Sequence, residues 1–177
     1  MNDFFEAIRP IISLSPESKS AFSKVMVRKE MKKGEILLEA EKICNHIYYI
    51  EKGLARTFYL KDGKDITDWI STEKNFTVSI VSFITRKPDR RSIELLEDSI
   101  LWSIYYDDLQ MLYREYHEIE RFGRLLVGTG LVQIQQRFDD LHFSSAQARY
   151  KKLLISNPTI IHRVPLGMIA TYLGISQ

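Results

Sequence analysis

The chain contains 177 residues, which is enough for one substantial domain and a smaller appendage. Its net charge is +2 and 45% of its residues are hydrophobic, a composition typical of a globular protein in water. No apolar run approaches the roughly 18 residues that cross a membrane, and the N-terminus is acidic where a signal peptide is basic, so we expect a cytoplasmic protein without membrane contact. Cys44 is the single cysteine, which excludes internal disulfides and thiolate-held iron–sulfur clusters.

Charge is distributed unevenly along the chain. From residue 142 to residue 177 the charged residues are Arg149, Lys151, Lys152 and Arg163, with no Asp or Glu. This segment carries a charge of +4, and because the net charge of the chain is +2, the remainder carries −2. A basic end on a slightly acidic body indicates a phosphate-bearing partner at that end, and a solvated basic face is the alternative.

Two short helices are predicted at the N-terminus. Apolar residues at helical spacing give each helix a buried face: Phe4, Phe5, Ile8, Ile11 and Ile12 in the first, and Phe22, Val25 and Met26 in the second. Ser15 is the expected N-cap of the second helix, and Pro16 suits its first position because the N–H that proline lacks would be unpaired there. We interpret both helices as packing elements.

Short strands follow from about residue 31. They are predicted at residues 36–38, 47–50, 54–60, 65–70, 93–96 and 100–104, with turn signals between them. Asp62-Gly63 indicates a two-residue hairpin, because both residues tolerate the positive φ of a type I′ turn. Several short strands closed by helices predict an α+β fold built on an antiparallel barrel or jelly roll.

Residues 75–92 are neither regular strand nor simple loop. Apolar residues predict one or two helical turns near residues 76–84, and a polar, proline-bearing loop follows. A helix N-terminus that faces Arg90 and Arg91 would bind an anion, since free N–H groups and guanidinium groups both suit phosphate oxygens. A solvated cluster of charges is the alternative.

One long helix is predicted at residues 118–141, after a helix at residues 105–116. Its apolar residues recur at three- and four-residue steps, and about 24 residues at about 1.5 Å each reach roughly 36 Å. Gly123, Gly128 and Gly130 each cost on the order of 1 kcal/mol relative to alanine, which a close approach of a second backbone would offset. We therefore predict a dimerisation helix that links two domains, and a helix packed only on its own domain is the alternative. The candidate dimer contacts are Ile119, Phe122, Leu126, Gly130, Ile134 and Phe138.

The C-terminal residues predict two further helices. Residues 144–154 form the first, with Ser144 as its cap, and residues 164–177 form the second, with a tight turn at Gly174. Ser176 is placed to cap another helix, which we expect beyond the end of this sequence. The segment therefore predicts the start of a helix-turn-helix without its base-reading helix.

These features together resemble the Crp/Fnr family of bacterial transcription regulators. Residues 47–53, IYYIEKG, resemble a barrel strand of the family that ends in Lys-Gly, and residues 118–141 resemble its dimer helix. Ala148-Arg149-Tyr150 resembles the start of its DNA-binding domain. Residues 169–176, IATYLGIS, resemble the first helix and turn of its winged helix-turn-helix, in a form similar to the branch common in Bacteroidetes.

The resemblance implies three parts with separate roles. An effector domain like a cyclic-nucleotide-binding barrel, which is an antiparallel double-stranded β-helix or jelly roll, is expected at residues 1–117. A dimerisation and linker helix is expected at residues 118–141, and a partial winged helix-turn-helix domain at residues 142–177. The implied partners are a second copy of the chain, DNA in the full-length protein, and RNA polymerase. The candidate DNA contacts are Arg149, Lys151, Lys152, Thr171, Ser176 and Gln177.

The expected effector pocket departs from the family pattern. Cyclic AMP binders of the family carry Gly-Glu and then Arg-Ser or Arg-Thr, with Glu on the ribose hydroxyl and Arg on the cyclic phosphate. This chain has Val78-Ser79 at the first place and reaches Arg91-Ser92 through a longer loop. Loss of a charge-assisted hydrogen bond costs on the order of 1.5–3 kcal/mol, so cyclic AMP is not expected as a tight ligand and the effector is unknown. The candidate effector contacts are Val78, Ser79, Ser82, Arg90, Arg91 and Ser92.

Three alternatives fit parts of the sequence. A metal-dependent cupin enzyme needs paired histidines and a carboxylate, yet only His46 lies in the strand region, so we predict no catalysis, no metal and no cofactor. A haem sensor would use His46 or His117, although a lone histidine is usually structural. A barrel that binds only a small molecule or a protein would leave the basic end without a role.

Overall fold

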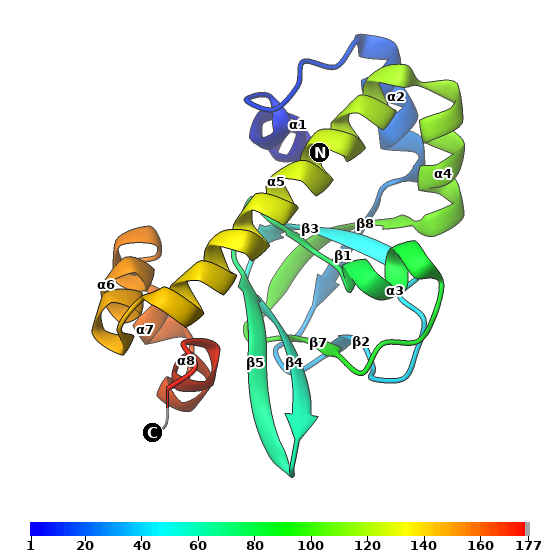
Figure 1. Ribbon diagram of the computed structural model, residues 1–177. Helices are drawn as coiled ribbons and strands as arrows, with labels where there is room; N and C mark the ends of the chain where they lie inside the picture. The colour runs from blue at the N-terminus through cyan, green and yellow to red at the C-terminus, as the bar shows by residue number, and fades with distance from the viewer. Residues whose placement is uncertain (176–177) are drawn as a thin grey trace.

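The computed structural model describes residues 1–175 (Figure 1). Within this range the strands form two antiparallel sheets of four strands each, which make the predicted jelly-roll barrel. The first sheet has the order β1 (Val27–Met31), β8 (Ser99–Tyr105), β3 (His46–Lys52) and β6 (Phe76–Thr77). The second has the order β2 (Ile36–Leu38), β7 (Ser92–Leu95), β4 (Ala55–Lys61) and β5 (Lys64–Ser71).

The hairpin between β4 and β5 has the predicted turn. Asp62 and Gly63 have φ values of 52° and 73°, and Lys61 pairs directly with Lys64. Positive φ at both central residues is the requirement of a type I′ turn, so the prediction is confirmed. This turn fixes the register of β4 and β5, and β5 is an edge strand of its sheet.

The strand β1 was not predicted. Its sequence, VRKEM, is mostly polar, and the side chains are half-buried or exposed because the strand lies at the edge of its sheet. Without alternation of apolar and polar residues the segment carried no strand signal. Pairing holds it in place, since all five residues are in register with β8. The two-residue strand β6 was also missed.

The N-terminal helices pack on one end of the barrel, as predicted. They are α1 (Asn2–Ile8) and α2 (Pro16–Val25), and the Ser15 hydroxyl accepts a hydrogen bond from the Ser18 N–H at 3.2 Å, which confirms Ser15 as the cap. Phe4 of α1 is fully buried and contacts Tyr49 edge to face, with ring centroids 5.3 Å apart. Phe4 also contacts Phe122, with centroids 6.5 Å apart. These rings join the N-terminus, the barrel and the long helix.

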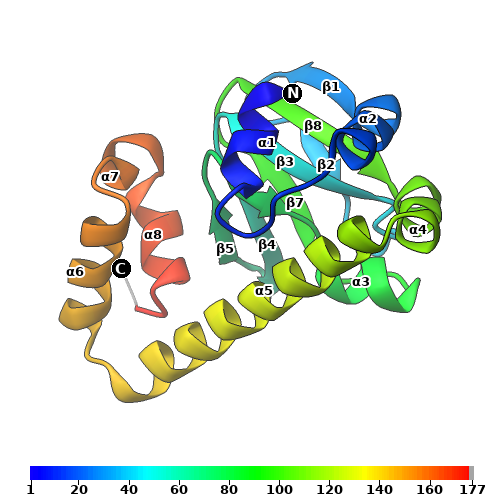
Figure 2. The same ribbon diagram turned by 90° about the horizontal axis from the view of Figure 1, so that it is seen from above.

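The long helix is α5 (His117–Phe143), which follows the short α3 (Ile80–Thr85) and α4 (Tyr106–Glu115). Figure 2 shows α5 running past the barrel from α4 to the C-terminal helices. Its first turns are buried within its own domain: Ile119 is 0% exposed and Phe122 is 4% exposed. The second half of α5, from about residue 127, is largely exposed.

The chain ends in three short helices, which we call the helical tail (residues 146–175). They are α6 (Ala146–Ser156), α7 (Ile160–Arg163) and α8 (Leu166–Tyr172). The cap of α6 is Ser145, whose hydroxyl accepts a hydrogen bond from the Ala148 N–H at 3.2 Å, so the prediction of Ser144 is wrong by one residue. The helix α7 was not predicted, because four residues are too few for a periodic signal. Gly174 has a φ of 64° and closes α8 with the expected turn, whereas the expected cap at Ser176 lies outside the described residues.

Two glycines of α5 differ in their surroundings, so alanine substitutions at these positions should have opposite effects on stability. A methyl group at Gly123 would overlap the Tyr113 ring of α4, whereas in the described part of the chain no atom of another element lies within 4 Å of one at Gly128. We expect Gly123→Ala to lower the free energy of unfolding by about 1–3 kcal/mol through overpacking. Gly128→Ala should raise it by about 1 kcal/mol through helix propensity. Urea unfolding followed by circular dichroism measures both, and a loss of similar size in the two variants would contradict this packing.

Candidate functional site

Two of the predicted effector residues, Ser79 and Arg91, belong to a network of hydrogen bonds and ion pairs within the chain. The Arg91 guanidinium donates from Nε to Asp68 Oδ2 at 2.7 Å and from Nη1 to Asp89 Oδ1 at 3.1 Å. The Ser79 hydroxyl donates to the other oxygen of Asp89 at 2.6 Å. The side chain of Asp89 is 6% exposed, and the structure therefore places a buried carboxylate against two of the predicted effector residues, Ser79 and Arg91.

This network satisfies the charge of Arg91 from within the chain. Burial lowers the pKa of Arg91, but the hydrogen bonds to Asp68 and the charge of Asp89 outweigh burial and raise it. An incoming anion would have to displace Asp89, and removing one partner of a buried ion pair costs about 3–5 kcal/mol. The backbone also fixes Asp89, whose carbonyl accepts a hydrogen bond from the Glu41 N–H at 2.7 Å.

The other predicted effector residues have structural partners. The buried Ser82 hydroxyl donates to the Lys87 carbonyl at 2.6 Å, and the Ser92 hydroxyl accepts from the Ala40 N–H at 3.0 Å. Val78 packs against the core of the barrel. Arg90 is exposed, with its guanidinium 5.5 Å from the centre of the Tyr59 ring. The structure thus brings Ser79, Arg91 and Asp89 together, while the remaining predicted residues hold the surrounding loops.

A second charged network was missed in the sequence. Arg56 of β4 is 4% exposed and binds both oxygens of Asp65, at 2.6 and 2.8 Å. Its Nε donates to Glu94 of β7 at 2.9 Å, and its guanidinium stacks on Phe58 at 4.1 Å. Sequence carried one signal for it, because Arg56 and Asp65 lie on the two strands that the Asp62-Gly63 turn pairs. The network crosslinks three adjacent strands and leaves no unpaired charge for a ligand.

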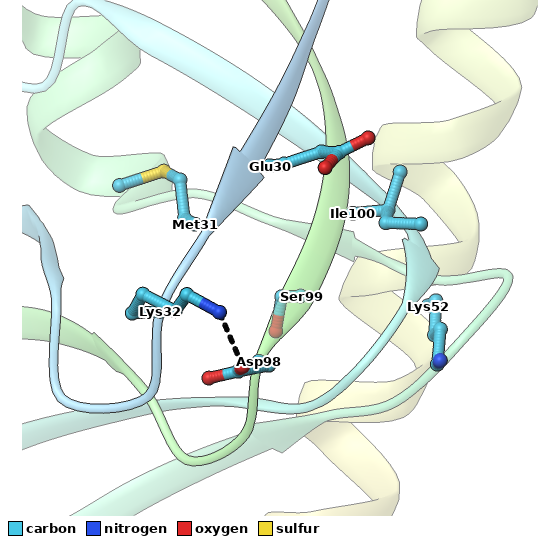
Figure 3. A pocket seen from close by; sticks show the side chains of 7 residues that line it. All are labelled: Glu30, Met31, Lys32, Lys52, Asp98, Ser99 and Ile100. Carbon is cyan, nitrogen blue, oxygen red and sulfur yellow. Dashed lines mark hydrogen bonds and ion pairs between the residues drawn. The ribbon is translucent and has the colours of Figure 1, made fainter.

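The surface hollows do not extend this site. One, of about 230 Å³, lies between β1 and the turn before β8, where Lys32 and Asp98 form an exposed ion pair at 2.8 Å (Figure 3). Another, of about 290 Å³, is lined by β2, the following loop and Tyr48 of β3. Neither contains Arg91 or Ser79. Among residues 1–175 no three His, Cys, Asp or Glu side chains are grouped to hold a metal ion.

The predicted dimer residues divide into two groups along α5. Ile119 and Phe122 are buried in the chain's own core, so the prediction that they contact a second copy is wrong. Leu126 is half-buried against the same core, and Gly130 has open space beside it. Ile134 and Phe138 are each 52% exposed. Sequence periodicity could not separate the groups, because one apolar stripe continues through both.

The exposed group belongs to a longer row, which we call the α5 seam. Its members are Val127, Leu131, Ile134, Phe138 and Leu141, which are between 38% and 67% exposed. They follow one another at steps of four, three, four and three residues. This is the heptad spacing of the apolar contacts in a two-stranded coiled coil. Monomeric proteins rarely leave such a row in water, which makes the seam a candidate interface.

The predicted DNA contacts are partly engaged within the chain. Arg149 donates to the Leu173 carbonyl at 2.8 Å and also to the Ser144 carbonyl, which ties α6 to the end of α8. Lys152 pairs with Asp140 of α5 at 2.6 Å. Lys151 is exposed, and within residues 1–175 no side chain forms an ion pair with it. Ser176 and Gln177 lie outside the described residues.

The comparisons with known proteins agree with this architecture. Residues 28–116 match the family model described as the cyclic nucleotide-binding domain, so the chain belongs to that family. Comparison with curated protein sequences gave no significant match. In the part of the chain that the structure describes, no helix is both long and apolar enough to cross a membrane.

Several solved structures share the fold over most of the chain. A protein from Eubacterium rectale, assigned to the Crp/Fnr family of transcriptional regulators, has a TM-score of 0.73 at 19% identity, covering 98% of this chain and 82% of that one. FixK2 from Bradyrhizobium japonicum has a TM-score of 0.74 at 14% identity, covering 86% and 79%. The c-di-GMP responsive regulator CLP of Xanthomonas campestris has a TM-score of 0.70 at 15% identity, covering 92% and 86%. The fold is therefore that of Crp/Fnr regulators, as the sequence predicted.

Proposed function

We propose that this protein is a dimeric, DNA-binding transcription regulator of the Crp/Fnr type that acts in the cytoplasm. The observation that carries the proposal is the α5 seam, an exposed heptad row placed between a cyclic-nucleotide-binding-type barrel and a basic helical tail. A coiled coil along this row would set two barrels and two tails around one axis. Paired tails suit the repeated half-sites of a DNA operator. The proposal assigns no catalytic role to the chain.

The proposed dimer interface begins at the point along α5 where its side chains are no longer buried against the barrel. The side chains up to Phe122 serve the chain's own core, and the seam from Val127 to Leu141 contacts the second copy. Burial of such side chains contributes about 25 cal/mol per Å² of apolar area removed from water. Gly128 and Gly130 lie within this exposed half, where a Cβ added to either would meet no atom of another element within 4 Å among residues 1–175.

The helical tail supplies the DNA contacts in this proposal. A regulator of this class places a helix in the major groove and uses Lys and Arg on phosphates to hold it there. The turn at Gly174 after α8 has the form of the helix-turn-helix turn, with the Ile175 N–H bonded to the Ala170 carbonyl at 3.0 Å. Lys151 is the exposed cation best placed for a phosphate, and RNA polymerase is the further partner that the class implies.

The barrel does not bind cyclic AMP in this proposal. Asp89 already occupies the hydrogen-bonding groups of Ser79 and Arg91, and Val78 offers no carboxylate for a ribose. A second anion beside Asp89 would be repelled by the negative charge of its carboxylate. Any effector would therefore have to be of another chemical class.

The interface is tested by placing a charge in the seam. Leu131→Glu would force two carboxylates into the coiled-coil contact, so we expect a dimer in the wild type and a monomer in the variant. Light scattering at micromolar concentration measures the mass. Gln136→Glu adds the same charge on an exposed position outside the seam and should remain dimeric. A wild-type monomer would contradict the proposed interface.

The DNA contact is tested through its dependence on salt. Lys151→Gln should weaken binding to double-stranded DNA similarly for all sequences and reduce the slope of log K against log salt by about 1. Fluorescence anisotropy over a salt series gives the slope. Lys64→Gln removes an exposed lysine from the tip of the β4–β5 hairpin and should leave the slope unchanged. Equal slopes for all three proteins would rule out the assigned contact.

The assignment of the barrel is tested with cyclic AMP. We expect no change in the melting temperature at about 100 μM cyclic AMP, whereas a ligand at about a hundred times its dissociation constant adds about 2.7 kcal/mol. Differential scanning fluorimetry measures the shift. A clear upward shift would show that the protein binds cyclic AMP and would contradict this assignment.

A further inference from the structure

The helical tail is docked on the barrel of its own chain. Both views place α8 beside β5 (Figures 1 and 2), and α8 and β5 are in contact. Leu54 and Leu96 of the barrel form one apolar cluster with the tail, and both are almost completely buried. The tail side chains of this cluster are Leu153, Ile160, Val164, Ile169 and Leu173. The barrel thus contributes few of the buried side chains, and most of the cluster belongs to the tail itself.

Polar contacts from a single arginine add to this docking. Arg163, at the end of α7, donates to both oxygens of Glu73 at 2.6 and 3.0 Å and to both oxygens of Glu97 at 2.7 and 2.9 Å. Glu73 follows β5 and Glu97 lies in the turn before β8. The hydrogen bonds to Glu97 and then Glu73 raise the pKa of Arg163 above its ordinary value. One guanidinium therefore joins two loops of the barrel to the tail.

A hydrogen bond at the sheet edge completes the contact. β5 is an edge strand, and the Thr67 N–H on its free side donates to the Thr171 hydroxyl of α8 at 3.1 Å. Thr67 is 1% exposed, so this N–H would lack a partner if α8 moved away without water replacing it. The amide of Thr67 is therefore a local reporter of the docked position.

Three of the four cations in residues 142–177 are engaged by groups of the same chain, and the barrel engages Arg163. Arg163 is bound to two carboxylates, Lys152 pairs with Asp140, and Arg149 is engaged with backbone carbonyls. Of the four cations in the segment, Lys151 alone is left without such a contact within the described residues. Binding to DNA depends strongly on the number of phosphates that Lys and Arg neutralise. Docking on the barrel itself engages Arg163, so the docked tail presents one cation fewer to DNA.

The ion pairs of Arg163 are of a kind that can open. The side chains of Arg163, Glu73 and Glu97 are 22%, 35% and 31% exposed, so water and salt reach them. Partly exposed pairs of this kind contribute modestly to stability and are screened by salt. A DNA phosphate would compete with the two carboxylates for the same guanidinium, since both are anions that a guanidinium binds through two hydrogen bonds.

We propose that Arg163, Glu73 and Glu97 form a latch that holds the helical tail on the barrel in a state of low DNA affinity, and that opening the latch frees Arg163 for a phosphate. The inference rests on the proposed DNA-binding function. It adds an autoinhibitory contact within one chain, made by residues outside both the effector site and the α5 seam.

Two sets of variants separate loss of the latch from gain of a cation. Glu73→Gln with Glu97→Gln removes both negative charges and leaves Arg163 in place. Hydrogen exchange in β5 and α8 should become faster, and affinity for double-stranded DNA should rise by about tenfold at about 0.1 M salt for one additional phosphate contact. Arg163→Gln should accelerate the same exchange without the gain in affinity, because the cation is lost.

A matched control accounts for the change in net charge. Asp62→Asn with Asp98→Asn also removes two carboxylates, at the hairpin tip and at the exposed Lys32 pair shown in Figure 3, and asparagine tolerates the positive φ of Asp62. Neither residue contacts the tail by a hydrogen bond. This control should show wild-type exchange in α8 and less gain in DNA affinity than the Glu73 and Glu97 variant.

The outcomes distinguish the latch from the proposed function. Faster exchange together with a gain in affinity beyond the control supports the latch. Unchanged exchange in β5 and α8, or an affinity equal to that of the control, overturns the latch while DNA binding by the wild type stands. No binding to DNA by any of the proteins at low salt overturns the proposed function and the autoinhibition with it.

Discussion

The contact between Phe122 and the barrel determines how the rest of the chain is arranged. Phe122 packs against Phe4 and Phe22 of the N-terminal helices and against Phe76 of the barrel, at centroid separations between 6.1 and 6.5 Å. Each such aromatic pair contributes about 0.5–1.5 kcal/mol beyond the area it buries. This anchor holds the first turns of α5, and so it decides both where the exposed seam begins and where the helical tail emerges.

Two charged networks crosslink the strands of the barrel. Arg56 and Arg91 are each bound to two carboxylates, and the strands β4, β5 and β7 are crosslinked through them. In a barrel built to bind an anion, at least one arginine would be free to accept it. Here the chain's own Asp89 accepts hydrogen bonds from Ser79 and Arg91, two of the residues predicted to bind an effector.

Much of the fold could be predicted from sequence because local signals were strong. The Asp62-Gly63 hairpin, the Ser15 cap, the long helix and the turn at Gly174 follow from rules that act within a few residues. The strand β1 could not be predicted from local sequence, because it is a strand only through pairing with β8, which lies some 70 positions away along the chain. The ion pairs could not be predicted for the same reason, because nothing near Arg91 or Arg163 in the sequence points to their carboxylate partners. Burial of Ile119 and Phe122 could not be predicted either, because it depends on helices from the other end of the chain.

The uninterrupted course of α5 has a mechanical consequence. From its last half-buried turn at Leu126 to its end at Phe143, the helix extends about 25 Å at about 1.5 Å per residue, without support from the barrel along its exposed face. A tilt of about 5° at the anchored end would carry the far end sideways by about 2 Å over that length. A helix of this length acts as a lever, so a small repacking around an aromatic ring at its anchored end is enlarged where α5 joins the helical tail.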